Sequence, residues 1–232
     1  MTMRAQLEQR ESALTDQSLE KLCRIAGASM MLAAVLYVWA FAAQYLLPAP
    51  SSNAAADTLQ FVADYSSFFV LSYALFSAAN ALSIVGALGV YVVTRAVDKS
   101  YAALGAMTLV VGLAGSLFSN TAPALISLAE GYASAATESE KQVYATAAAA
   151  AGAMNDPLAA SAVIGVGVLF ISLALLKRPA WSSLAYLGFV AGVLNIVRGL
   201  PVVANYSLVT LVFVALSSLW IFGVGRLVYR RA

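Results

Sequence analysis

The sequence predicts an all-α fold: a polytopic bundle of six transmembrane helices, with both termini on the cytoplasmic side and a short extracytoplasmic helix before span four. Composition is the first reason, because 62% of the 232 residues are hydrophobic and only 10% are charged, whereas a soluble domain carries about 25% charged residues. The second reason is that uncharged stretches reach the roughly 20 residues that a helix needs to cross a bilayer core. None of these stretches alternates with period two, which argues against a transmembrane β-barrel.

Prolines and charged residues set the limits of the spans. Pro48 and Pro50 follow the first span, and Arg95 follows the second. We place the six spans at about 25–47, 67–94, 101–128, 157–176, 181–199 and 207–226, in a single domain of residues 24–231 that follows a cytoplasmic leader of residues 1–23. The connections after spans two and four are tight, so each should close an antiparallel helical hairpin.

The basic residues predict the orientation, because cytoplasmic loops of membrane proteins carry an excess of Lys and Arg. With the N-terminus inside, only Lys141 and Arg198 of the 13 basic residues lie outside. The others are Arg4, Arg10, Lys21, Arg24, Arg95, Lys99, Lys177, Arg178, Arg226, Arg230 and Arg231. The opposite topology would invert this ratio. The predicted localisation is a bacterial cytoplasmic (inner) membrane, with several passes.

Both outer loops contain a predicted helix. In the first, residues 48–64, a run of Pro, Ser and Asn precedes a short amphipathic segment. In the second, Thr137 and Glu140 have the spacing of a capping box, and an alanine-rich run that favours helix follows them. Asp156 and Pro157 then have the pattern of a new helix start. The sequence therefore predicts an outer helix, a turn and then span four.

Missing residue types exclude several kinds of site. There is no histidine, which excludes His-ligated haem, most zinc sites and Ser-His-Asp triads. The single cysteine, Cys23, excludes an intrachain disulfide. A net charge of +2 disfavours binding to nucleic acid. We therefore expect no catalytic residues, no metal and no cofactor; the expected partners are membrane lipids, with a protein partner or a homo-oligomer as alternatives.

Small residues within the spans predict where helices approach closely. Gly188 and Gly192 form a GxxxG pair in span five, and Gly112 and Gly165 lie in spans three and four. Lipid provides no hydrophobic drive between helices, so packing of small residues contributes much of their association. We favour packing within the chain, with a homodimer seam as the alternative.

Four polar residues within the spans are candidates for a binding site: Asn80, Asn120, Asn195 and Arg198. Polar groups are costly in lipid and usually face the interior of a bundle. These four are candidates to line an outward-facing polar cavity. The alternative, which we favour at this point, is hydrogen bonding between helices, at about 0.6 kcal/mol for each bond.

Arg198 lies near the predicted outer end of span five. It can extend to the lipid headgroups, bind a ligand or form an ion pair with a carboxylate at the same depth. The candidate partners are Asp156, Glu130 and Asp64. We favour Asp156, because it opens the neighbouring span.

Four segments carry a resemblance to a known family: RIAG at 24–27, ALSIVG at 81–86, GVGVLF at 165–170 and LAYLG at 184–188. In their order and spacing the chain resembles a family of uncharacterised bacterial six-span membrane proteins with a domain of unknown function (DUF4386-like). The resemblance implies the six-span topology and implies no activity.

Three functions remain open. The first is a non-enzymatic membrane protein that associates with a partner, senses, or binds an amphiphile within its bundle. The second is a small-solute or lipid transporter or channel that uses the polar faces of the spans, with a cavity reaching Asn80. The third is a membrane enzyme at the outer interface, which requires at least two of Asp64, Glu130 and Asp156 to converge on one pocket with Arg198. The absence of a carboxylate in the middle of any span disfavours ion-coupled transport.

Overall fold

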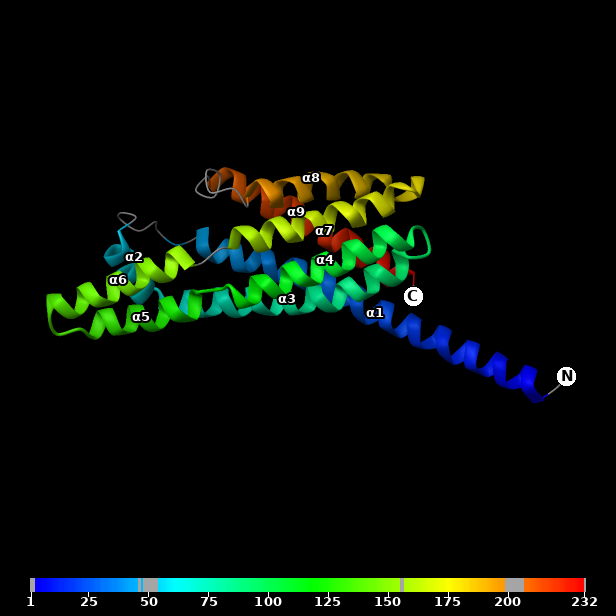
Figure 1. Ribbon diagram of the computed structural model, residues 1–232, viewed down its shortest axis with the longest axis horizontal. Coiled ribbons are helices and arrows are strands. Elements are labelled where there is room, and N and C mark those ends of the chain that lie inside the picture. Colours follow the sequence, from blue (N-terminus) through cyan, green and yellow to red (C-terminus); the bar gives the residue numbers. More distant parts are fainter. Residues whose placement is uncertain (1–2, 46, 48–53, 155–156, 199–206, 232) are drawn as a thin grey trace.

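The computed structural model of the chain describes residues 3–45, 47, 54–154, 157–198 and 207–231. Their regular structure is entirely helical, which confirms the predicted all-α class (Figure 1). The elements in chain order are α1 (Met3–Tyr45), α2 (Ala55–Asp64), α3 (Ser66–Thr94), α4 (Lys99–Phe118), α5 (Ala122–Ser134), α6 (Glu138–Met154), α7 (Pro157–Leu176), the 3-10 turn η1 (Pro179–Trp181), α8 (Ser182–Arg198) and α9 (Ser207–Arg230).

Several helices have the length and composition of membrane spans. Within the described residues, 5 stretches are long and apolar enough to cross a membrane: Gln17–Ala42, Ser66–Thr94, Lys99–Ser134, Pro179–Arg198 and Thr210–Arg230. A shorter apolar stretch, Ala160–Leu176, lies in α7. Their outward faces carry large apolar side chains, such as Trp39 and Met107, which are 63% and 69% exposed. This surface is compatible with a multi-pass membrane protein, because lipid does not penalise exposed apolar area as water does.

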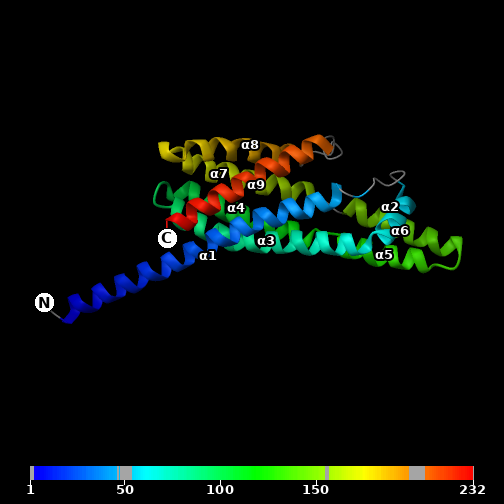
Figure 2. The ribbon, with the colours of Figure 1, turned by 180° about the vertical axis from the view of Figure 1, so that it is seen from behind.

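The long helices α1, α3, α4, α7, α8 and α9 lie side by side and form a bundle (Figures 1 and 2). α1 packs against α3 and α9, α4 packs against α7, and α7 packs against α8. The short connections from α3 to α4 and from α7 to α8 lie at the end of the bundle that holds the C-terminus (Figure 1). Each connected pair packs together, so both predicted hairpins are present.

α1 is longer than the predicted first span. It is one continuous helix of 43 residues, about 65 Å long at a rise of 1.5 Å per residue. Its first part extends beyond the bundle as a single helix (Figure 1). From Met3 onward, the predicted cytoplasmic leader of residues 1–23 is therefore helical and continues into the first apolar helix. No proline lies between Met3 and Tyr45, so nothing in the backbone ends the helix earlier.

The predicted third span, 101–128, is two helices rather than one. α4 ends at Phe118 and α5 begins at Ala122. Between them, Asn120 Oδ1 accepts a hydrogen bond from the backbone N–H of Ala122 at 2.9 Å. Pro123 occupies the first turn of α5, where its missing N–H needs no helical partner. The hydrogen bond to Asn120 and the proline in the first turn favour the start of a new helix here, whereas the apolar stretch continues across the break.

α2, α5 and α6 form a small second packing unit, which lies at the end of the molecule opposite the C-terminus (Figure 2). Its core contains Leu59, Val62, Ala129 and Ala148. Leu59 and Val62 are 0% and 2% exposed. The short helix predicted in the first outer loop is therefore present as α2, and it buries its apolar face against α5 and α6.

The predicted capping box opens α6. The backbone N–H of Glu140 donates to Thr137 Oγ1 at 3.2 Å, and the backbone N–H of Thr137 donates to Glu140 Oε2 at 3.1 Å. This reciprocal pair satisfies donors that a helix N-terminus would otherwise leave open. The helix predicted before span four is confirmed as α6, and the membrane side on which it lies is considered below.

Glycines allow the closest contacts between helices. A Cβ atom on Gly165 would lie 2.6 Å from the carbonyl oxygen of Gly192, so α7 and α8 meet backbone to backbone there. A Cβ on Gly112 would lie 2.8 Å from the backbone nitrogen of Ile164, across the contact of α4 with α7. Gly188 lies at an equally close contact with side chains of α7 and α9. All four glycines proposed from the sequence therefore lie at contacts within the chain.

The loop between α3 and α4 is joined to the end of α7. Asp98 is the N-cap of α4, because its Oδ1 accepts from the backbone N–H of Tyr101 at 2.9 Å. Its other carboxylate oxygen accepts a hydrogen bond from Lys177 Nζ. The hydrogen bond from Lys177, followed by that from the N–H of Tyr101, lowers the pKa of Asp98, and the bond to Asp98 raises the pKa of Lys177. This ion pair links the two hairpins.

Candidate functional site

A cavity lies at the centre of the bundle, and all six long helices contribute to its wall. Its volume is about 90 Å³. Along α1 it extends from Met30 to Phe41, roughly 16 Å at the helical rise. The cavity is therefore long and narrow. The residues with polar atoms in its wall are Tyr37, Asn80, Ser83, Ser116, Ser161, Asn195, Arg198, Ser217, Ser218 and Trp220.

The structure brings together three of the four polar residues that the sequence singled out. Asn80 of α3 and Asn195 and Arg198 of α8 all line the cavity. Asn120 does not line it, because it lies in the break between α4 and α5, where its side chain accepts a hydrogen bond from the backbone N–H of Ala122. The polar cavity thus contains three of the proposed residues, and Asn120 has a local structural role instead.

Asn80 and Trp220 have buried polar atoms with no protein partner. Asn80 is 1% exposed, and its Oδ1 accepts a hydrogen bond from the hydroxyl of Tyr37 at 2.8 Å. Its amide nitrogen Nδ2 has no hydrogen-bond partner. The indole nitrogen Nε1 of Trp220, a residue that is 2% exposed, also has none. Both residues line the cavity. Trp220 Nε1 itself packs against Gly188 of α8, because a Cβ on that glycine would lie 2.3 Å from it, and Gly188 does not line the cavity. Asn80 therefore provides the unsatisfied N–H donor that we consider for the cavity.

The side-chain nitrogen of Asn195, unlike that of Asn80, has hydrogen-bond partners within the protein. Its Nδ2 donates to the carbonyl oxygen of Ala191, one turn earlier in α8, at 2.9 Å. The same nitrogen lies 3.5 Å from Ser217 Oγ of α9. Asn195 therefore joins α8 to α9 in the way the helix-packing interpretation predicts. Of the two asparagines in the cavity wall, Asn80 is the one whose side-chain nitrogen has no partner.

Arg198 lies at one end of the cavity between two aromatic rings. Its guanidinium carbon is 4.8 Å from the ring centroid of Phe213 and 5.5 Å from that of Phe41. Stacking of this kind stabilises a guanidinium group that is partly removed from water. The arginine is half-buried. The sequence analysis considered headgroup contact, a ligand and an ion pair for Arg198, and it did not consider this cation–π environment.

The carboxylates proposed as partners of Arg198 are placed elsewhere or are not described. Asp156 lies outside the described residues. Glu130 is exposed on α5, and α5 makes no contact with α8 in the part of the chain that the structure describes. An ion pair of Glu130 with Arg198 is therefore not formed. Asp64 is exposed and accepts a hydrogen bond from Gln60 at 2.8 Å.

The chemistry of the cavity follows from these groups. Its described wall contains donors, hydroxyls and one cation, but neither Asp64 nor Glu130. Such a wall can bind a hydrogen-bond acceptor, yet it offers no carboxylate for general acid or base catalysis. Among the described residues, no group of three or more Cys, Asp or Glu side chains is placed to hold a metal ion.

Sequence reasoning missed the aromatic members of the site. Tyr37 and Trp220 have polar atoms, but hydropathy counts them with the apolar residues of α1 and α9. A signal was available, because the N–H of Trp and the O–H of Tyr usually find a partner when they are buried. The sequence contains 3 Trp residues. The rotation of each helix about its axis decides which of them faces the central cavity, and hydropathy does not give this rotation.

Comparison of the chain with protein-family models, curated proteins and solved structures found no match. The resemblance to the bacterial six-span family therefore stays a prediction.

Proposed function

We propose that this chain is a six-span, non-enzymatic membrane protein that binds a small amphiphilic molecule in its central cavity. The observation that carries the proposal is the unsatisfied donor Asn80 Nδ2, on a buried residue that lines the central cavity. A ligand with a hydrogen-bond acceptor would satisfy it.

The energetics favour an occupant that binds this donor. A buried donor without a partner costs about 1–3 kcal/mol, so the folded chain gains from a molecule that supplies an acceptor to Asn80. Most of the remaining wall is apolar, with Leu109, Leu113 and Val168 among its residues. Water needs two to four polar partners to stay in such a space. A molecule with an acceptor group and a short apolar chain matches both parts of the wall.

The charge of Arg198 favours a ligand whose polar group is neutral or anionic rather than cationic. Its guanidinium carries a positive charge at one end of the cavity, and a ligand ammonium group placed there would be repelled. The polar group of the amphiphile is therefore an alcohol, a carbonyl or a carboxylate in this proposal.

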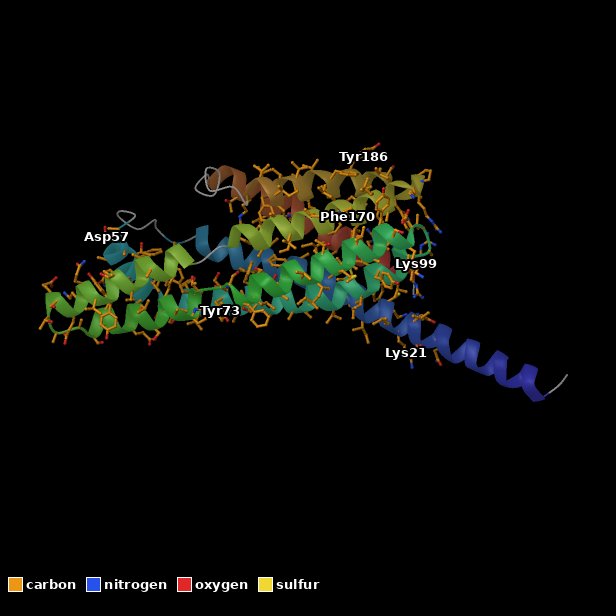
Figure 3. All side chains as sticks on the ribbon, in the orientation of Figure 1. Lys21, Asp57, Tyr73, Lys99, Phe170 and Tyr186 are labelled. Carbon is orange, nitrogen blue, oxygen red and sulfur yellow. The ribbon has the colours of Figure 1, made fainter. Side chains whose placement is uncertain are left out.

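The proposed topology has six spans with the N- and C-termini in the cytoplasm. α7 is 20 residues long, about 30 Å at the helical rise, and it packs between α4 and α8 in the bundle. Lys21 and Lys99 lie at the bundle end near the C-terminus, and Asp57 lies at the far end (Figure 3). An excess of basic residues on the cytoplasmic side supports this orientation, in which α6 is extracytoplasmic.

A solute pathway is the second candidate function. It is favoured by one observation: the cavity is central, is lined by all six long helices and reaches Asn80. A transporter would need this cavity to open to each side of the membrane in turn. An enzyme at the outer interface is less well supported, because Asp64 and Glu130 are exposed and do not line the cavity.

Binding to Trp220 tests the proposed function. The purified full chain is prepared with Trp39→Phe and Trp181→Phe, which leaves Trp220 as the remaining fluorophore of the 3 Trp residues. Hexanol, hexanoate and hexylamine are then titrated in detergent micelles. Hexanol and hexanoate should change the Trp220 emission saturably, and hexylamine should bind at least tenfold more weakly, because its ammonium group offers no acceptor and meets Arg198.

Two asparagine variants make the test specific. Asn80→Leu removes the donor and should weaken hexanol binding about tenfold, which corresponds to about 1.4 kcal/mol. Asn120→Leu is the matched control, because the same chemical change is made at a residue outside the cavity, and it should leave the affinity unchanged. Equal affinities for hexanol with and without Asn80→Leu would contradict binding through Asn80, and an unchanged Trp220 emission would show that hexanol does not enter the cavity.

A further inference from the structure

A second pocket lies at the opposite end of the bundle from Arg198, near the C-terminus. Its volume is about 410 Å³, and it is formed by α1, the end of α3, η1 and the residue that follows α9. Arg178, Trp181 and Arg231 contribute its polar wall, together with Glu20 of α1. None of these residues lines the central cavity, so this pocket is independent of the proposed function.

Two arginines share one indole ring in this pocket. The guanidinium carbon of Arg178 lies 5.0 Å from the ring of Trp181, and that of Arg231 lies 5.2 Å from the same ring. Trp181 itself is 7% exposed, so its indole ring is held in place by packing, and both guanidinium groups lie against it. The two cations are consequently held within about 10 Å of each other, roughly one Debye length at 0.1 M salt. Two like charges at that separation repel each other unless an anion lies between them.

Among the described residues, no carboxylate supplies that anion. Glu20 lies in the pocket wall, but its carboxylate pairs with Arg24 at 2.6 Å. Among the residues that the structure describes, neither Arg178 nor Arg231 forms an ion pair with a carboxylate. The pocket therefore has an excess positive charge, carried by planar donor groups that match the oxygens of phosphate.

We propose that this pocket binds a phosphate-bearing anion, either the headgroup of an acidic phospholipid or free phosphate. Arg178 and Arg231 would each donate to phosphate oxygens while Trp181 holds both guanidinium groups in place. Val92 and Val93 of α3 provide an apolar wall beside them, which an acyl chain can cover. A basic pocket between helices at the end of a membrane bundle is a general setting for acidic lipid headgroups.

Native mass spectrometry of the full chain tests the proposal. Phosphatidylglycerol or phosphatidylcholine is added to the detergent-solubilised protein, and the retained lipid is counted. The wild type should retain phosphatidylglycerol at least tenfold better than phosphatidylcholine. Arg178→Gln with Arg231→Gln should abolish this preference, whereas Arg226→Gln with Arg230→Gln, which removes the same charge from exposed positions outside the pocket, should preserve it.

Two further measurements distinguish the source of the phosphate and the role of the stack. Inorganic phosphate at millimolar concentration should leave phosphatidylglycerol in place if the ligand is a lipid, and should displace it if the ligand is free phosphate. Arg178→Lys with Arg231→Lys keeps the charge but loses the planar donors, so it should retain less than one third of the bound lipid. Equal losses in the two glutamine variants, or full retention in the lysine variant, would overturn the proposal.

Discussion

Gly112 and Gly115 lie three residues apart on α4, and their surroundings differ sharply. A Cβ on Gly112 would lie 2.8 Å from the backbone nitrogen of Ile164, and backbone cannot move aside as a flexible side chain can. A Cβ on Gly115 would meet only the Cβ of Ala160, at an ordinary distance of 3.9 Å. The same residue type is therefore required at one position and replaceable at the other, and only the contact with α7 distinguishes them.

Alanine substitutions should separate these two glycines. Gly112→Ala is expected to lower the free energy of unfolding by about 1–3 kcal/mol, the usual cost of overpacking a well-packed contact. Gly115→Ala should be neutral or should stabilise by up to about 1 kcal/mol, because alanine favours helix more than glycine does. Thermal or SDS-induced unfolding in mixed micelles measures both. Similar stabilities for the two variants would contradict the packing of α4 on α7.

At the scale of elements, Asp98 determines where α4 begins and how the two hairpins are joined. Its carboxylate caps α4 through the N–H of Tyr101 and binds Lys177 at the end of α7. The pKa of Asp98 is lowered in the folded chain, and that of Lys177 is raised. A carboxylate with a lowered pKa stabilises the fold above its ordinary pKa, and this contribution is lost as the pH falls through the folded value. A lysine with a raised pKa stabilises below its ordinary pKa, and its contribution is lost as the pH rises through the folded value.

Asp98→Asn should remove this dependence on pH. Asparagine is also a good N-cap, so the substitution removes the charge and largely keeps the cap. The wild type should have the higher Tm between about pH 4 and pH 10, and the two proteins should converge at lower pH, where Asp98 is protonated. Tm measured in detergent across this range tests the sign. A constant difference in Tm at every pH would show that the charge of Asp98 does not contribute.

At the scale of the whole molecule, charge is distributed unequally between the two ends of the bundle. The end near the C-terminus includes Arg95, Lys99, Lys177 and Arg178, whereas the unit of α2, α5 and α6 contains Asp and Glu residues with Lys141 as its one described basic residue. The packing of α2, α5 and α6 on one another gives this acidic end its own small core. In the proposed topology, the core lies outside the cytoplasm.

Labelling of single cysteines should establish this topology. Cys23→Ser removes the one native thiol, and new thiols are introduced as Ser139→Cys in α6 and Ser100→Cys at the start of α4, both at exposed positions. A membrane-impermeant maleimide should modify Ser139→Cys in intact cells, and should modify Ser100→Cys only after the membrane is permeabilised. The reverse pattern would place the basic end outside, and labelling of both in intact cells would argue against a spanning bundle.

The sequence by itself determined the features that depend on one segment at a time. Apolar stretches without charge predicted the helical class, the spacing of Thr137 and Glu140 predicted the start of α6, and short connections predicted the two hairpins. Hydropathy did not show that a new helix begins between Asn120 and Pro123, inside a continuous apolar stretch. Nor did it show that the polar leader and the first apolar segment form one helix, since hydropathy does not report where a backbone helix ends.

Only the tertiary structure decided which polar groups meet. The cavity at Asn80 depends on the relative rotation of six helices, and that rotation is set by contacts between distant residues such as Gly165 and Gly192. The same contacts place Trp220 in its wall and leave Asn120 outside it. The pairing of Arg178 with Arg231 likewise requires η1 and the end of α9 to lie together. Hydropathy and capping act along a segment of a few turns, whereas a binding site in a bundle is a property of how segments pack.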